Sequence, residues 1–171
     1  KGVLTRDDAK RAVVEGADAI VVSNHGGRRL DGMPATIDRM QQVAEIVDGK
    51  SELLLDSGVR RGTDVLKALA SGARAVFVGR PVFWGLAVAG IEGTLQVLKI
   101  LHNELDLAMG YCGVTSVDQI DRTILDMPAN IRDRVPSYIV EIRELCIFQG
   151  YLGLQGRLNL RFKLTADNPI S

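Results

Sequence analysis

The sequence of 171 residues is poor in cysteine and has no excess of either charge. Its two cysteines, Cys112 and Cys146, lack the spacing of metal ligands, so we expect neither a disulfide framework nor a metal site. Lysine and arginine together number 21, as do aspartate and glutamate, which argues against a protein that binds nucleic acid or a charged membrane surface. We find no signal peptide and no apolar run long enough to span a bilayer. These absences predict a cytoplasmic protein without a nucleic-acid or membrane partner.

Short apolar runs alternate with helical patterns over the first 80 residues. The runs are rich in leucine or β-branched residues and predict buried strands over residues 18–23, 53–55 and 75–78. Helices are predicted before, between and after them, over residues 5–15, 36–47, 63–70, 82–89 and 91–109, with a last helix starting at Ser116. Alternation of this kind with short connections predicts an α/β protein with a parallel sheet, either open or closed into a barrel.

The first predicted strand is followed by a polar, glycine-rich loop. Residues 23–28, Ser-Asn-His-Gly-Gly-Arg, place the imidazole of His25 three positions before the guanidinium of Arg28. An imidazole suits a general base because its pKa lies near the operating pH, and a planar guanidinium suits the binding of a carboxylate. We therefore interpret this loop as a reaction site rather than as a simple turn.

The loops after the second and third strands predict an anion site. Residues 56–60, Asp-Ser-Gly-Val-Arg, and residues 79–80, Gly-Arg, combine glycines, arginines and the starts of helices. Glycines let backbone N–H groups approach an anion, and helix N-termini and arginines attract its charge. Because each segment directly follows a strand that is preceded by a predicted helix, we expect the two segments to form one phosphate cradle.

Together with Lys1-Gly2-Val3, these three loops resemble segments of the FMN-dependent α-hydroxy-acid oxidases and dehydrogenases, the family of glycolate oxidase and lactate oxidase. The resemblance covers residues 1 to about 125 and implies that family's fold, a TIM (β/α)₈ barrel. It also implies the FMN-dependent oxidation of a small 2-hydroxy acid to a 2-oxo acid. By this resemblance His25 is the catalytic base and Arg28 binds the substrate carboxylate, both in contact with the substrate.

The same resemblance implies the contacts of the cofactor. Lys1 would lie near N1 and O2 of the flavin, and Ser23 at the edge of the ring. Where the family has Asp-Gly-Gly-Val-Arg, this chain has serine at the second position, a small residue that can donate to phosphate. The segments expected to hold the FMN phosphate comprise Asp56, Ser57, Gly58, Val59, Arg60, Gly79 and Arg80.

The resemblance also implies that the chain is part of a larger barrel. A complete barrel of this kind takes about 250 residues, and here no initiator methionine and no strand precede Lys1. We therefore expect residues 1–126 to be the C-terminal half of such a barrel. Residues 127–171 form a tail without a family counterpart, in which residues 157–164 alternate with the period of a half-buried strand. Because intact relatives are commonly tetramers, a homo-oligomer is expected.

Two other functions stay open at this point. Another FMN- or phosphate-binding barrel enzyme would explain the anion loops, but not His25 together with Arg28. A non-catalytic or decayed barrel fragment would explain the missing first half. Four further side chains are expected to be structural: Phe77, Phe83 and Trp84 in the core, and Arg29 facing outward or packing on its loop.

Overall fold

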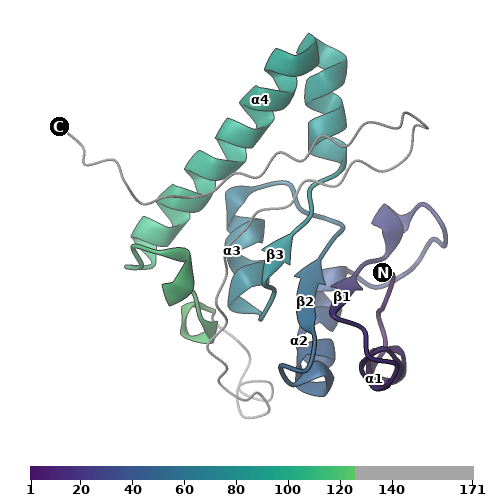
Figure 1. The fold of residues 1–171 in the computed structure, drawn as a ribbon. Coiled ribbons are helices and arrows are strands. Elements are labelled where there is room, and N and C mark those ends of the chain that lie inside the picture. The colour runs from purple at the N-terminus through teal and green to yellow at the C-terminus, as the bar shows by residue number, and fades with distance from the viewer. Residues whose placement is uncertain (126–171) are drawn as a thin grey trace.

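The computed structural model describes residues 1–125, which are built around a parallel sheet of three strands, drawn in Figure 1. The strands β1 (Ala19–Val22), β2 (Glu52–Leu55) and β3 (Ala75–Val76) lie in the order β1-β2-β3. Both pairings are parallel. Val3 forms an isolated parallel bridge with Val22 beyond β1. The prediction of a parallel α/β arrangement is therefore confirmed.

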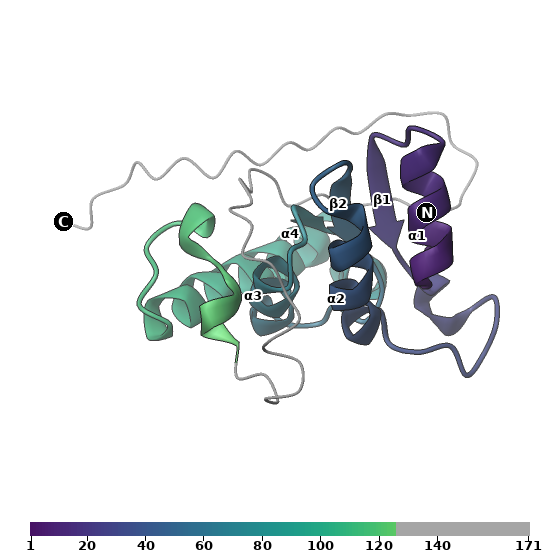
Figure 2. The same ribbon diagram turned by 90° about the horizontal axis from the view of Figure 1, so that it is seen from below.

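The strands are linked by helices that begin and end near the predicted residues. They are α1 (Arg6–Val14), α2 (Thr36–Val47) and α3 (Gly62–Ala70). The hydroxyl of Thr5 starts α1 because it accepts from the Asp8 backbone N–H at 3.1 Å, which satisfies one of the free donors of the first turn. Figure 2 shows α2 and α3 on the same face of the sheet. That placement follows from right-handed connections between strands that neighbour one another in chain order.

The core lies between this face of the sheet and the helices. It contains alternate residues of the strands and the inner faces of α2 and α3, among them Ile20, Val22, Met40, Val43, Leu53, Leu55, Val65, Leu69 and Val76. The third strand is shorter than predicted, because Val76 already pairs with Leu55, the last residue of β2. Beyond it, only the Phe77 N–H still donates to the Leu55 carbonyl, at 2.8 Å.

The long helix α4 (Arg80–Tyr111) is a hairpin of two arms. Ala89 and Gly90 have non-helical backbone angles, so the two predicted segments and the break between them are confirmed. Figure 1 shows the first arm leaving the end of β3 and the second running back past α3. The arms cross at two glycines: a Cβ on Gly93 would lie 2.0 Å from the Gly85 carbonyl oxygen, and a Cβ on Gly85 would lie 2.5 Å from that of Gly93. Only glycine allows this approach.

The same helix corrects one expectation. Within the part of the chain that the structure describes, α4 as a whole is long and apolar enough to cross a membrane by length and composition only, with 17% of its most apolar window buried, although the break at Ala89 and Gly90 divides it into two arms. The sequence was expected to contain no such segment. The expectation was based on uninterrupted apolar runs, and glycines and single polar residues such as Glu92 interrupt the run here. The mean hydropathy of the helix is nevertheless high.

The segment after α4 differs from the predicted helix at Ser116. Two short 3₁₀ turns follow instead, Val117–Gln119 and Arg122–Ile124. The predicted capping interaction is present, since the Ser116 N–H donates to the Gln119 side chain at 3.3 Å. The helix does not continue because Asp121 caps the second turn, accepting from the Thr123 N–H at 2.8 Å. The tail and the strand predicted over residues 157–164 lie outside the described residues.

Replacing Gly93 by alanine tests the crossing of the two arms. The added methyl group would collide with the Gly85 carbonyl, so we expect Gly93→Ala to lower the free energy of unfolding by about 3 kcal/mol. Urea unfolding followed by the fluorescence of the single tryptophan, Trp84, measures it. Gly110→Ala is the matched control, because a Cβ there meets no atom within 4 Å and alanine favours the helix by about 0.5–1 kcal/mol. Equal destabilisation by both changes would contradict the close crossing.

Candidate functional site

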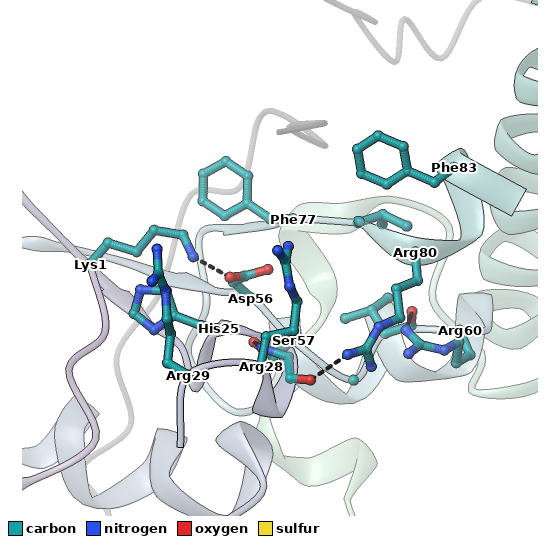
Figure 3. A pocket seen from close by; sticks show the side chains of 15 residues that line it. Lys1, His25, Arg28, Arg29, Asp56, Ser57, Arg60, Phe77, Arg80 and Phe83 are labelled. Atoms are coloured by element: carbon teal, nitrogen blue, oxygen red, sulfur yellow. Dashed lines mark hydrogen bonds and ion pairs between the residues drawn. The ribbon is translucent and has the colours of Figure 1, made fainter. Parts of the chain in front are cut away.

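The carboxyl ends of the three strands open into one cavity of about 640 Å³, seen in Figure 3. All but one of the residues predicted for the site line it: Lys1, His25, Arg28, Asp56, Ser57, Gly58, Val59, Arg60, Gly79 and Arg80. The exception, Ser23, is 1% exposed and lies beneath the lining. The fold therefore brings together segments from Lys1 to Arg80, because parallel strands place all their carboxyl ends at one edge of the sheet.

Lys1, Ser23 and Asp56 form a hydrogen-bonded network at the floor of this cavity. The Lys1 ammonium donates to the Ser23 hydroxyl at 2.9 Å and forms an ion pair with the Asp56 carboxylate (Figure 3). The Ser23 hydroxyl donates to the same carboxylate at 2.6 Å and accepts from the His25 N–H at 3.1 Å. The buried hydroxyl thus joins the ends of β1 and β2 to the N-terminal segment. The predicted contact of Ser23 with a flavin ring stays a prediction.

The pKa of Asp56 reflects two opposing causes. Burial alone would raise it, but hydrogen bonds from Lys1 and Ser23, the positive charge of Lys1 and the Ser57 N–H together lower it below its usual value. Asp56 is therefore held as a carboxylate, and its charge keeps the Lys1 ammonium at the cavity wall.

His25 sits in a tight turn whose backbone is left-handed. The 3₁₀ turn His25–Gly27 has positive φ at all three residues, 56° at His25, 68° at Gly26 and 73° at Gly27. Asn24 holds the turn, because its side-chain oxygen accepts from the Gly26 N–H at 2.9 Å. The two glycines adopt these angles freely, whereas His25 is strained there, as residues at functional sites often are.

The imidazole of His25 packs against the backbone of Gly2. A Cβ added to Gly2 would lie 2.8 Å from Cε1 of the ring, and the φ of Gly2 is +98°. Glycine at this position therefore makes the space that the imidazole occupies. Sequence reasoning used Gly2 only as part of a motif, and nothing in the one-dimensional pattern signals its contact with residue 25.

Two arginines, not one, line the cavity beside His25. Arg28 does so as predicted, and Arg29 lines it as well, although it was expected to face outward or pack on the loop. Figure 3 draws both side chains among those that line the cavity. Arg29 is exposed, as expected, but it also faces the cavity because the chain leaves the 3₁₀ turn irregularly, so adjacent side chains do not alternate between two faces as they would in a strand.

The opposite wall of the cavity is the predicted anion cradle. Ser57 and Gly58 have positive φ, 79° and 85°, and a Cβ on Gly58 or Gly79 would meet no atom within 4 Å. The starts of α3 and α4 lie next to this wall, and Asp64 fixes the turn before α3 by accepting from the N–H groups of Arg60 and Arg61 at 2.9 and 3.0 Å. The N–H groups at the start of α3 are occupied, since that of Gly62 also donates to a carboxylate, Glu104, at 2.8 Å. The open backbone at Gly58 and Gly79, the N-terminus of α4 and two arginines are a donor set that fits a phosphate group.

The aromatic residues near the cradle correct the expectation that they belong to the core. Phe83 and Trp84 are 42% and 54% exposed, and Phe77 and Phe83 line the cavity. The guanidinium of Arg60 stacks over the Trp84 ring, 5.1 Å from its centroid. Phe77 follows the end of β3, and Phe83 and Trp84 lie on the projecting first arm of α4. Their residue type alone therefore predicted more burial than the fold provides.

Comparison with known proteins adds a family match. The family model described as FMN-dependent dehydrogenase matches residues 1–127. 2-Hydroxyacid oxidase 1 of Mus musculus is 58% identical over 125 residues, which cover 73% of this chain and 34% of that protein. L-lactate oxidase of Nostoc sp. is 54% identical over 127 residues, covering 74% of this chain and 35% of the relative. The chain thus spans about a third of the length of the curated relatives that it matches.

Solved structures of mandelate oxidase resemble the described fold. The complex with (S)-2-phenylpropionate is 51% identical to this chain with a TM-score of 0.68, covering 71% of this chain and 36% of that one. A mutant of mandelate oxidase that holds a monooxide FMN adduct matches with the same identity and TM-score, covering 71% of this chain and 38% of that one. In both cases the match is to a chain that is much longer than this one.

Removing the carboxylate of Asp56 tests the network. Because the pKa of Asp56 is lower in the folded protein than its ordinary value of 3.8, the charged carboxylate stabilises the fold at pH values above 3.8. This contribution to the free energy of unfolding is lost as the pH falls through the lower pKa of the folded state. We expect Asp56→Asn to lower the free energy of unfolding at pH 7 by about 2 kcal/mol and to flatten its fall in acid. Lys1→Met should flatten it in the same direction. Denaturant unfolding between pH 2 and pH 7 measures both; slopes equal to that of the parent would contradict the pairing.

Filling the space beside His25 tests its packing. Gly2→Ala places a methyl group against the ring and should displace the imidazole, whose two-bond proton–nitrogen NMR signals then shift. Since the chain has only two histidines, the signals of His102 are an internal reference. Gly16→Ala is the matched control: it carries similar backbone strain, with φ of +77°, but a Cβ there meets nothing within 4 Å. Shifts of the His25 signals by the same amount in both variants would contradict the contact.

Proposed function

Because the chain belongs to the FMN-dependent dehydrogenase family, we propose that it forms the base-bearing and phosphate-binding part of an enzyme that oxidises a 2-hydroxy acid to a 2-oxo acid with FMN. One observation carries the proposal. His25 and Arg28 share a single cavity with the anion cradle of residues 57–60 and 79–80. A base, a carboxylate-binding group and a phosphate site within one cavity are what this reaction requires.

We further infer that β1, β2 and β3 are consecutive strands of a (β/α)₈ barrel. Their parallel pairing in chain order, their helices on one face and a site at their carboxyl ends support this inference. The mandelate oxidase structures support it as well, since they match the described part at 51% identity. Neighbouring strands of the barrel would pair beyond Val3 and beyond β3.

The residues of the cavity fit FMN. The backbone of residues 57–60, together with Arg60 and Arg80, would hold its phosphate, and the Lys1 ammonium would face the electron-rich part of its ring. When bound, FMN supplies the acceptor for the two electrons that leave the α-carbon of the substrate. Asp56 holds Lys1 in place for this role, because the two groups form an ion pair.

The protein's own side chains handle the substrate. A planar guanidinium can bind both oxygens of a carboxylate, so Arg28 would fix the acid group of the substrate, and Arg29 would add positive potential for an anion. An imidazole nitrogen of His25 would accept the proton that the substrate loses, while the ring is held against Gly2. The shared wall of the cavity orients both groups toward one bound molecule. A homo-oligomeric assembly and a cytoplasmic location stay predictions.

A catalytically silent barrel segment is the second candidate. Two measurements separate the candidates. The full chain is titrated with FMN, following the quenching of flavin fluorescence, and lactate or glycolate is then added without oxygen while the visible flavin band is recorded. In parallel, residues 1–125 replace the matching segment of mouse 2-hydroxyacid oxidase 1. Bleaching of the flavin in either protein supports the proposal; bound flavin that no 2-hydroxy acid bleaches in either protein refutes it.

The role of His25 is tested by His25→Gln in the same chimera. Glutamine keeps a polar side chain but cannot take up the proton, so we expect kcat to fall by about 10²–10⁴-fold while the affinity for FMN is unchanged. The control is His102→Gln, which changes the second histidine, exposed on α4, and should leave kcat within about twofold. If His25→Gln lowered the affinity for FMN as strongly as it lowered kcat, the role of base would be wrong.

A further inference from the structure

Both polar backbone groups of Gly26, the residue after His25, are held by the anion cradle. The Gly26 N–H donates to the Ser57 hydroxyl at 3.0 Å, in addition to its bond to Asn24 within the turn. The Gly26 carbonyl accepts from Nη2 of Arg80 at 2.5 Å. Ser57 follows Gly26 by 31 positions and Arg80 follows it by 54. The turn that carries the imidazole is therefore tied to both segments of the cradle.

The backbone at Ser57 is unusual for a residue with a side chain. Its φ of +79° lies in the left-handed region, and within residues 1–125 only His25 and Asp48 are other non-glycine residues with positive φ. Glycine would adopt this angle without strain, and glycine is what the family pattern has at this position. Serine adds only a hydroxymethyl group, whose oxygen accepts the Gly26 N–H and lies 3.4 Å from the Ser23 hydroxyl.

The backbone of Ser57 is itself anchored. Its carbonyl accepts from the Thr36 hydroxyl at 3.0 Å, at the buried start of α2. The Ser57 hydroxyl therefore projects from a fixed point of the core toward a turn that is also held by its own asparagine, by the Ser23 hydroxyl at the His25 N–H and by a long arginine side chain. A short side chain on a rigid base restricts its partner more than a long, exposed one does.

We propose that Ser57 is a positioning residue, which fixes the His25 turn at a set distance from the anion cradle through the Gly26 N–H. This inference rests on the proposed function, in which His25 is the base and the cradle holds the cofactor phosphate. An anion that orders the turn of residues 57–60 then also orders the turn of His25. By reciprocity, a fixed His25 turn favours anion binding by the same factor.

Two variants separate the hydroxyl from the strained backbone. Ser57→Ala removes the hydroxyl and keeps the unfavourable φ, whereas Ser57→Gly removes both. Ser71→Ala is the matched control, since its hydroxyl also makes a hydrogen bond, here as the donor to the Lys67 carbonyl at 2.8 Å, but directly after α3 and outside the cavity. If Ser57→Ala fails to fold, Ser57→Gly carries the test alone.

The readout is hydrogen exchange of the Gly26 amide, measured by NMR on the full chain with and without inorganic phosphate. In both Ser57 variants we expect this amide to exchange at least about tenfold faster than in the parent, with Ser71→Ala unchanged. Phosphate should slow the exchange in the parent and leave it unaffected in the Ser57 variants. Exchange at the rate of the parent in both variants would overturn the proposal. Loss of phosphate affinity with unchanged protection of Gly26 would also overturn it, because Ser57 would then act on the anion alone.

This test is independent of catalysis. If the bound flavin were bleached in neither the chain nor the chimera, the proposed function would fall while the exchange of Gly26 could still depend on Ser57. Conversely, if the chimera were active but the exchange rate of the Gly26 amide did not change in the Ser57 variants, the proposed function would stand and the positioning role would be rejected.

Discussion

The ion pair between Lys1 and Asp56, closed by the buried hydroxyl of Ser23, is the interaction on which the site depends. The parallel sheet places three strand ends at one edge, but it does not by itself fix the loops that leave them. The network does so, because each of its three groups comes from a different segment and each satisfies another's charge or hydrogen bond. Burial of Asp56 opposes this arrangement, and the hydrogen bonds from Lys1 and Ser23 with the charge of Lys1 outweigh that opposition.

Hydrogen bonds connect this network to the His25 turn and, through that turn, to the two segments of the anion cradle. Ser23 accepts the backbone N–H of His25, and the next residue, Gly26, is bound by Ser57 and Arg80. His25 and the predicted anion cradle are thus parts of one connected layer at the carboxyl edge of the sheet. Such a layer suits a reaction in which a phosphate-anchored cofactor and a proton acceptor must keep a constant spacing.

Several features of the molecule could be predicted because they depend on local sequence. The hydroxyl of Thr5, the buried runs of the strands and the break at Gly90 are read from a few adjacent residues, and the structure has them where the patterns indicate. The exposed positions of Phe83 and Trp84 could not be predicted in this way. Burial is a property of what packs on a side chain from elsewhere in the chain, and residue type gives only its average.

The sequence by itself determined the kinds of groups at the site and the strand ends that carry them, because a strand that ends in glycine and charged residues is a local pattern. Tertiary structure alone decided how these groups meet: that Arg29 lines the cavity with Arg28, that Gly2 makes room for the imidazole and that Ser57 holds Gly26. These contacts join residues that lie up to 31 positions apart, and no periodicity encodes them. They exist because parallel pairing brings distant loops to one edge of the sheet. There the absence of a methyl group at Gly2 and the hydroxyl of Ser57 determine how closely the His25 turn approaches its neighbours.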